Sequence, residues 1–129
     1  AKDSLCLLLD SMGSLAGFYR LAYVSFVGGT MVPIGGHNVL EPASAGSPVC
    51  FGPHVSHIKE VARGLLTQGA AFEVANAAGL GRVLGDLLSD PASARLLGEK
   101  AGALARSLRG ATQKNMALII PWLAGPKVP

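Results

Sequence analysis

The chain has 129 residues, of which 50% are hydrophobic and 15% are charged, and its formal net charge is +3. This length suits one domain, and this hydrophobic fraction excludes an intrinsically disordered chain. The net charge is too small to indicate a nucleic-acid-binding protein, so no nucleic acid partner is expected.

The first half of the chain predicts short strands that alternate with helices. In chain order we expect a strand at Leu5–Leu9, a helix at Leu15–Leu21, a strand at Tyr23–Val27, a helix from about Asn38 to Gly46 and a strand at Val49–Phe51. The strands are almost continuously apolar, which is typical of a parallel sheet that is buried on both faces. Ser11 or Ser14 can cap the first helix.

The second half continues the alternation and then becomes helical. We expect a helix at His57–Gln68, a strand at Ala71–Val74, a helix from the Asn76 cap to Leu88, a helix at Pro91–Leu108 and a last helix at Ala111–Leu123. Ile58, Val61, Ala62 and Leu65 share one side of the first of these helices, and Pro121 is expected to kink the last one. The pattern predicts an α/β fold, a parallel sheet with helices on both faces, over residues 1–124, followed by a flexible tail at 125–129.

Two cysteines and one apolar run bear on the cellular compartment. Cys6 and Cys50 lie in apolar runs without metal-ligand or redox spacing, so buried, reduced thiols in a cytosolic protein are expected. Leu5–Leu9 is too short for a signal peptide or a membrane span, so we expect no membrane anchor in this chain.

Positive charges dominate the late part of the chain. Five basic residues are accompanied there by a single acid, Glu99: Arg95, Lys100, Arg106, Arg109 and Lys114. Such a run usually forms the solvated face of a helix. The alternative is attraction to an anionic ligand or to a membrane surface.

The stretch from Phe26 to Pro53 contains the main candidate for a binding site. A predicted strand ends at Gly28-Gly29, a loop follows, and a helix is expected directly after Gly35-Gly36. Free amides at a helix start attract anions, and glycines allow a phosphate to approach the backbone closely. His37 and Asn38 at the helix entrance can donate hydrogen bonds to the same phosphate.

Glu41 has two possible roles. It follows Asn38 by three positions, so on a helix it projects near the same side, where its carboxylate can accept hydrogen bonds from a ribose diol. The alternative is a capping box, in which Asn38 caps the helix and Glu41 reaches back to it. The spacing alone favours the capping box.

The same stretch resembles a known family. GGxxVxxGGHNxLEPAxxGxPVxFGPH is similar to the signature of the transferases for 3-deoxy-D-manno-octulosonic acid (Kdo), DSMGSL is similar to their DTMGEL, and NMALIIPWL is similar to their closing helix. The resemblance covers nearly the whole chain. It implies a Rossmann-like fold, truncated at its N-terminal side, that is part of the C-terminal, donor-binding domain of a GT-B glycosyltransferase. Such an enzyme acts in lipopolysaccharide biosynthesis.

The resemblance also implies the site and the partners. The donor is CMP-Kdo, the acceptor is a lipid A precursor held by an N-terminal domain absent from this chain, no metal or cofactor is needed, and the parent enzyme works at the cytoplasmic face of the bacterial inner membrane. Matched by motif, the residues expected to bind CMP are Ser11, Met12 and Gly13 around the nucleotide, Gly35, Gly36, His37 and Asn38 at the phosphate, and Glu41 at the ribose.

Some positions depart from the family pattern. Ser14 replaces the acid of DTMGEL, and Ser56-His57-Ile58 replaces FNF. His54 and His57 are interpreted as loop histidines rather than a catalytic pair. The carboxylate base of the family belongs to the missing half, so no residue here is assigned as catalytic and the chain alone is expected to be inactive. The alternatives are an interaction module with a vestigial nucleotide pocket and a sugar-nucleotide epimerase, and the GGHNxLEP block argues against the latter.

The resemblance predicts a truncated sheet and a dimer. Leu5–Leu9 would be the third strand of the donor domain and Tyr23–Val27 the fourth, and strands one and two normally lie between them. Either Leu5–Leu9 pairs directly with Tyr23–Val27, or a second chain covers the open edge. We expect a symmetric homodimer, because two-fold dimers are the commonest oligomers.

Overall fold

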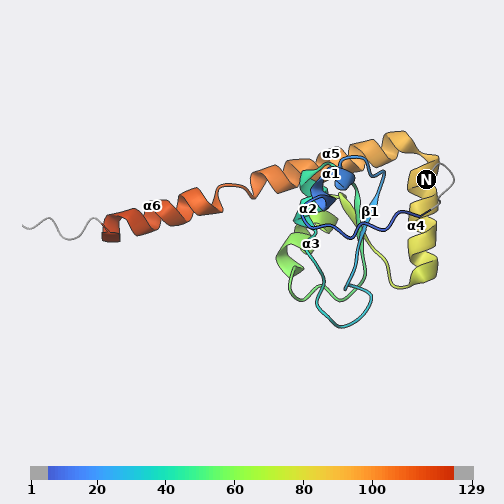
Figure 1. The fold of residues 1–129 in the computed structure, drawn as a ribbon, viewed down its shortest axis with the longest axis horizontal. Coiled ribbons are helices and arrows are strands. Elements are labelled where there is room, and N and C mark those ends of the chain that lie inside the picture. Colours follow the sequence, from blue (N-terminus) through green and yellow to red (C-terminus); the bar gives the residue numbers. More distant parts are fainter. Residues whose placement is uncertain (1–5, 124–129) are drawn as a thin grey trace, which may run out of the picture.

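The computed structural model describes residues 6–123 and has a three-stranded parallel sheet at its centre. The strands β1 (Ser25–Val27), β2 (Val49–Phe51) and β3 (Ala71–Glu73) lie in the order β1-β2-β3, with Phe26 opposite Cys50 and Cys50 opposite Phe72. The helices are α1 (Leu15–Tyr19), α2 (Leu40–Ser44), α3 (Lys59–Thr67), α4 (Ala77–Ser89), α5 (Pro91–Ser107) and α6 (Ala111–Leu123) (Figure 1). The predicted α/β class and parallel sheet are confirmed.

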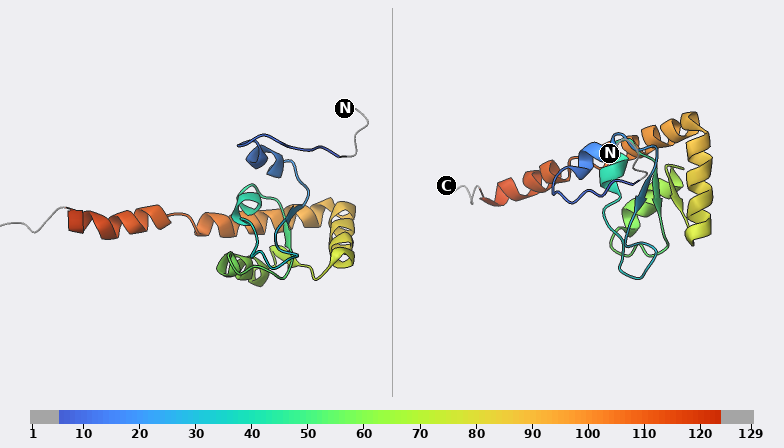
Figure 2. Two further views of the ribbon diagram at one scale, coloured as in Figure 1. Left: turned by 60° about the horizontal axis from the view of Figure 1, so that its bottom comes forward. Right: turned by 45° about the vertical axis from the view of Figure 1, so that its right-hand side comes forward.

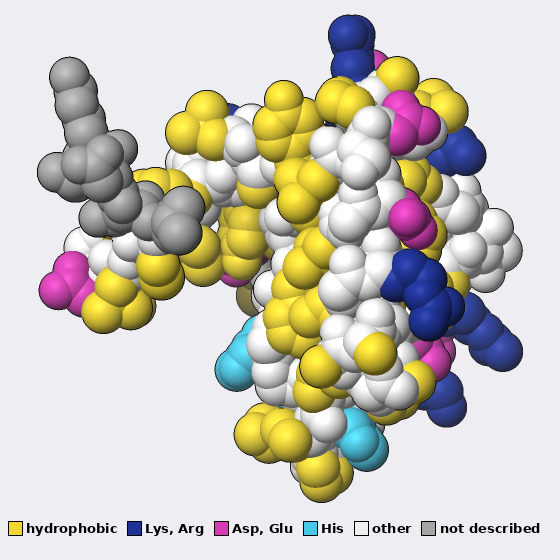
Figure 3. Space-filling view, turned by 90° about the vertical axis from the view of Figure 1, so that its right-hand side faces the viewer, with side chains coloured by type: hydrophobic (Ala, Val, Ile, Leu, Met, Phe, Trp, Pro, Cys, Tyr) yellow, Lys and Arg dark blue, Asp and Glu magenta, His cyan; other side chains and the backbone are white. Residues whose placement is uncertain are grey.

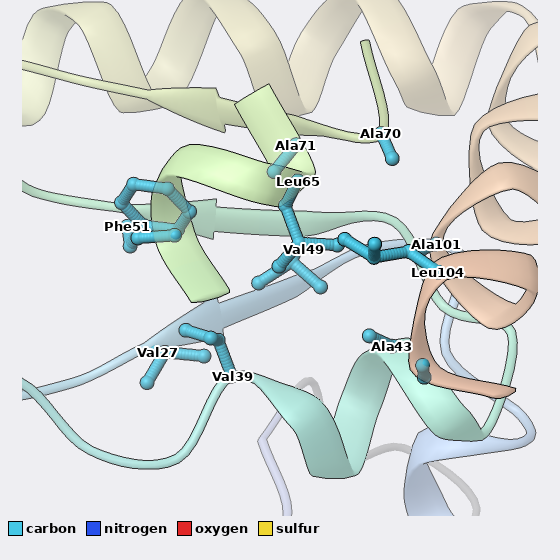
Figure 4. Packing of buried hydrophobic residues seen from close by; sticks show 12 residues of the cluster. Val27, Val39, Ala43, Val49, Phe51, Leu65, Ala70, Ala71, Ala101 and Leu104 are labelled. Carbon is cyan, nitrogen blue, oxygen red and sulfur yellow. The ribbon is translucent and has the colours of Figure 1, made fainter. Parts of the chain in front are cut away.

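The core lies on one face of the sheet, under α2, α3 and α5 (Figure 4). The strands contribute Val27, Val49 and Phe51, and α3 contributes Leu65, which is fully buried. Alternation along a strand sends neighbouring side chains to the other face. On that face Cys50 is fully buried, but Phe26 is 39% exposed, so the second face is covered only in part. Burial raises the pKa of the Cys50 thiol to about 11.

A buried threonine joins the carboxyl ends of β1 and β2. The Thr30 hydroxyl donates to the Val27 carbonyl oxygen at 2.6 Å and accepts from the Gly52 amide at 2.8 Å. A buried hydroxyl that is satisfied in both roles is stabilising, whereas an orphaned partner is costly. Thr30 therefore fixes the two loops that leave this edge of the sheet.

The helix signals in the second half of the sequence are confirmed. Asn76 caps α4 by accepting from the Gly79 amide at 2.9 Å, and Asp90 caps α5 by accepting from the Ser93 amide at 3.1 Å. Gly110, at φ +97°, separates α5 from α6. Pro121 lies inside α6, whose described side chains are all exposed, and α6 projects away from the sheet (Figure 1).

The prediction of a strand at Leu5–Leu9 is wrong for the residues that the structure describes. Residues 6–9 have no regular structure, and Leu7 and Leu8 are 72% and 85% exposed. A strand needs a ladder partner, but this segment runs beside α1 and away from the sheet (Figure 2). Cys6 is exposed for the same reason, contrary to the expected burial. Leu5 and the predicted tail at 125–129 lie outside the described residues.

Other predicted boundaries shift by a few residues. β1 begins at Ser25 rather than Tyr23, and α2 begins at Leu40, four residues after the second glycine pair rather than directly after it. Within residues 6–123, every helix is too short or too polar to cross a membrane.

Candidate functional site

The carboxyl end of β1 opens into a pocket of about 350 Å³. It is lined by Leu15 and Tyr19 of α1, by Phe26, Val27 and Gly28 at the strand end, and by His37, Asn38 and Glu41. The lining therefore combines apolar and aromatic residues with polar side chains. Ligand pockets commonly combine these two surfaces. We call this the strand-end pocket.

Asn38 and Glu41 form a hydrogen-bonded pair in this pocket. The Asn38 side-chain nitrogen donates to the Glu41 Oε1 at 3.1 Å, and the Asn38 Oδ1 accepts from the Leu40 amide at 2.9 Å. The Asn38 side chain thus bonds to the first residue of α2, whose N-cap position is occupied by Val39 without a side-chain cap, and Glu41 bonds to the side chain of Asn38 instead of its backbone amide. The spacing correctly placed these two residues on the same side, but the capping box that it favoured is not formed, because Val39 occupies the N-cap position. The contact with Asn38 holds the Glu41 side chain at the pocket.

The pKa of the nearby Tyr19 phenol is raised by two causes. Burial raises the pKa of the Tyr19 phenol, and the negative charge of Glu41 raises it further. The phenol is therefore neutral and able to donate a hydrogen bond at physiological pH. An aromatic donor and a carboxylate acceptor therefore line the same pocket, a combination suited to a sugar or a nucleoside.

The glycine-rich loop differs from the predicted anion site of free amides. The Gly36 amide donates to the Gly29 carbonyl at 3.0 Å, and the His37 amide donates to the Gly28 carbonyl at 3.4 Å. The loop folds back on the strand end, so these two amides are already used. Gly35 and Gly36 have φ values of +102° and +85°, which few other residues adopt. Their local role is this turn.

The histidines after β2 support the same loop. The His57 amide donates to the Gly35 carbonyl at 3.0 Å, and a Cβ on Gly35 would lie only 2.6 Å from the His57 ring. The His54 amide donates to the Thr30 carbonyl at 2.9 Å. Figure 3 shows histidine side chains at separate places on the face that it draws. These contacts give His54 and His57 structural roles in the loop.

The structure does not bring all the predicted residues together. Ser11, Met12 and Gly13 do not line the strand-end pocket, and Met12 is 99% exposed. Gly35 lines a different hollow of about 360 Å³ beside His54 and Lys59. Among residues 6–123, no three His, Cys, Asp or Glu side chains are grouped so that they could hold a metal ion.

Comparison with known proteins places the chain in a family. No family model matches it. It is 34% identical over 117 residues to the 3-deoxy-D-manno-octulosonic acid transferase of Bordetella pertussis, covering 91% of this chain and 27% of that protein. It is 36% identical over 123 residues to the protein of the same name from Haemophilus influenzae, covering 95% of this chain and 29% of that protein. The chain belongs to the Kdo transferase family.

A solved structure supports the same assignment. The chain matches the crystal structure of the C-terminal CMP-Kdo binding domain of WaaA from Acinetobacter baumannii with a TM-score of 0.70 and 31% identity, over 75% of this chain and 51% of that one. This likeness confirms the predicted Rossmann-like fold of a Kdo transferase C-terminal domain. The chain spans 27% and 29% of the lengths of the two Kdo transferases compared above.

Sequence reasoning missed several residues that line the two pockets. Leu15, Tyr19 and Phe26 line the strand-end pocket, and Arg20 lines a neighbouring one. Arg109 lines that neighbouring pocket too, and the sequence had named it only within the basic run, with an anionic ligand as one alternative. Tyr19 and Phe26 were assigned to elements, but no local pattern shows that a helix and a strand face one hollow. An aromatic residue two positions before the Gly28-Gly29 turn was the available signal for Phe26.

Proposed function

We propose that this chain binds the nucleotide of the CMP-Kdo donor in a Kdo transferase. The observation that carries the proposal is the Asn38–Glu41 pair, joined at 3.1 Å in a pocket at the carboxyl end of β1. Ligands of open α/β sheets bind at this end of the strands. The related solved domain is named for CMP-Kdo binding.

Each group of predicted site residues has a role in this proposal. Glu41 accepts hydrogen bonds from the ribose hydroxyls, and its bond from Asn38 orients it for them. The phosphate lies against the Gly35–Asn38 loop, where the side chains of His37 and Asn38 donate, since the amides of Gly36 and His37 are engaged. Ser11, Met12 and Gly13 contact the nucleotide from the segment that leads into α1, which lines the pocket through Leu15 and Tyr19.

Titration calorimetry with CMP tests this proposal. We expect weak but saturable binding of CMP, and weaker binding of inorganic phosphate, because phosphate alone lacks the ribose contacts with Glu41. Absence of CMP binding at millimolar concentration would instead favour the assembly module with a vestigial pocket.

For the whole enzyme we propose transfer of Kdo to a lipid A precursor at the cytoplasmic face of the bacterial inner membrane. This chain spans only 27–29% of the two Kdo transferases compared above. The acceptor would be held by the part of the enzyme outside this chain. We assign no catalytic residue among residues 1–129.

The purified 129-residue chain is expected to transfer no Kdo. Catalysis requires both substrates to be held in one arrangement that stabilises the transition state, and here only the donor side is provided. Release of CMP from CMP-Kdo in the presence of a lipid A precursor is the measurement. Sustained turnover above the uncatalysed rate would refute this prediction.

We further propose that the chain forms a symmetric dimer through the open edge of β1. In the described residues β1 pairs only with β2, and Tyr23 and Phe26 are 58% and 39% exposed nearby. An unpaired strand edge beside exposed apolar side chains is prone to association. These features, together with the exposed α6, also favour the alternative function as an assembly module.

Light scattering at micromolar concentration is expected to give the mass of two chains. Phe26→Lys should shift the mass toward one chain, because it places a charge beside the proposed interface. Arg82→Glu on α4 is a control that should leave the mass unchanged. A single-chain mass for the unchanged protein would exclude the dimer.

A further inference from the structure

A second pocket adjoins the strand-end pocket and shares two of its residues. It has a volume of about 380 Å³ and is lined by Ala16, Arg20, Asn38, Leu40, Glu41, Ser44, Ala45 and Arg109. Leu15 and Tyr19 of α1 face the strand-end pocket, whereas Ala16 and Arg20 line this one. Positions four apart share a side of a helix, so neighbouring sides of α1 serve the two pockets. We call this the arginine pocket.

Two exposed arginines from distant parts of the sequence line the arginine pocket. Arg20 follows α1 directly, and Arg109 lies just after α5. Across residues 6–123, the ion pair that forms is Arg95–Glu99, at 3.0 Å, so neither guanidinium lies within ion-pairing distance of a described carboxylate. Glu41 is the acid that lines the pocket, and its Oε1 accepts from Asn38.

Helix-end electrostatics account for only one of these arginines. A cation after α5 is stabilised by the carbonyl end of that 17-residue helix. The five-residue α1 provides little comparable field for Arg20. Solvation of each guanidinium group by water does not explain why the fold places Arg20 and Arg109 at the same pocket. Two guanidinium groups in one pocket match the planar geometry of a carboxylate or phosphate.

We propose that the arginine pocket binds an oxyanion of the sugar-nucleotide donor. This inference rests on the proposed function, because the shared Asn38–Glu41 pair would hold the ribose between the two pockets. The donor carries two such groups, the phosphate of the nucleotide and the carboxylate of the sugar acid. The phosphate and the carboxylate are both oxyanions that accept hydrogen bonds from Arg20 and Arg109. Both belong to the same donor molecule as the ribose.

Binding of three probes to Arg20→Gln, Arg109→Gln and the double variant tests the inference. Cytidine carries neither anion, CMP carries the phosphate, and free Kdo carries the carboxylate. We expect each single variant to weaken binding of at least one anionic probe about tenfold, which is typical of a lost hydrogen bond between charged groups. Cytidine binding should be unchanged. A loss for CMP identifies the phosphate, which would then be shared between the arginines and the side chains of His37 and Asn38. A loss for Kdo identifies the carboxylate.

Arg82→Gln is the matched control, because Arg82 is an exposed arginine of α4 that lines neither pocket. Thermal unfolding of each variant reports whether the fold is intact, and Arg20→Lys should recover part of the lost affinity. Unchanged binding of CMP and Kdo, or an equal loss in Arg82→Gln, would overturn the inference while leaving the strand-end pocket intact. Failure of the unchanged chain to bind any of the probes would overturn both proposals.

Discussion

Replacing Gly98 with alanine is expected to lower the free energy of unfolding by about 1–3 kcal/mol, the usual cost of overpacking a tight contact. Gly98 lies buried in α5, and a Cβ there would overlap the carbonyl oxygen of Gly46 and lie 3.4 Å from the Pro48 ring. Both partners are rigid, since Gly46 is backbone in a turn at φ +81° and Pro48 is cyclic. The clash therefore outweighs the gain in helix propensity.

Gly85→Ala is the matched control for this substitution. Gly85 lies in α4, where a Cβ would meet nothing within 4 Å. Alanine there should raise stability by up to about 1 kcal/mol through helix propensity alone. Urea denaturation of both variants measures the difference. If Gly98→Ala is as stable as Gly85→Ala, then α5 does not pack against the turn at Gly46. The described packing of α2 against α5 would then be wrong.

Replacing Glu41 with glutamine is expected to weaken CMP binding roughly tenfold to hundredfold, corresponding to about 1.5–3 kcal/mol for hydrogen bonds to a charged group. Glutamine keeps the length and the oxygen that accepts from Asn38 at 3.1 Å. It loses the charge that would receive two ribose hydroxyls. Binding of inorganic phosphate should change far less, because phosphate does not contact the ribose site.

Two comparisons separate ribose binding from capping. The 2′-deoxy analogue of CMP should bind the unchanged chain more weakly and should show a smaller further loss in Glu41→Gln, since the two changes remove the same contact. Glu60→Gln is the control, because Glu60 is exposed in the first turn of α3 and lines neither pocket. Equal weakening of CMP and phosphate would indicate that Glu41 serves mainly to cap α2.

Local signals predicted the helices better than the sheet edge. Proline at the start of α5 and the side-chain caps of Asn76 and Asp90 act within one turn, so the sequence suffices to place them. Leu5–Leu9 is apolar enough for a buried strand, but a strand also needs a neighbour. The sequence pattern could not show that residues 6–9 would have none.

The candidate site likewise contains some contacts that local spacing predicts and others that it does not. Asn38 and Glu41 are three positions apart, so their contact follows from local geometry, and the spacing predicted it. The engaged amides of Gly36 and His37 depend on the loop folding back to Gly29 and Gly28, which spacing does not determine. Tyr19, Arg20 and Arg109 reach the two pockets only through packing of α1 and α5 around α2. Contacts of that kind follow from tertiary structure alone.

Mapping CMP on the chain by nuclear magnetic resonance tests the central claim most directly. The account predicts saturable shifts of the backbone signals of Tyr19, Gly28, His37, Asn38 and Glu41, which line the strand-end pocket. Signals of α4, which lies outside that pocket, should stay unchanged. No shifts at millimolar CMP, or shifts confined to elements that do not line the strand-end pocket, would contradict the assignment of this site to the nucleotide.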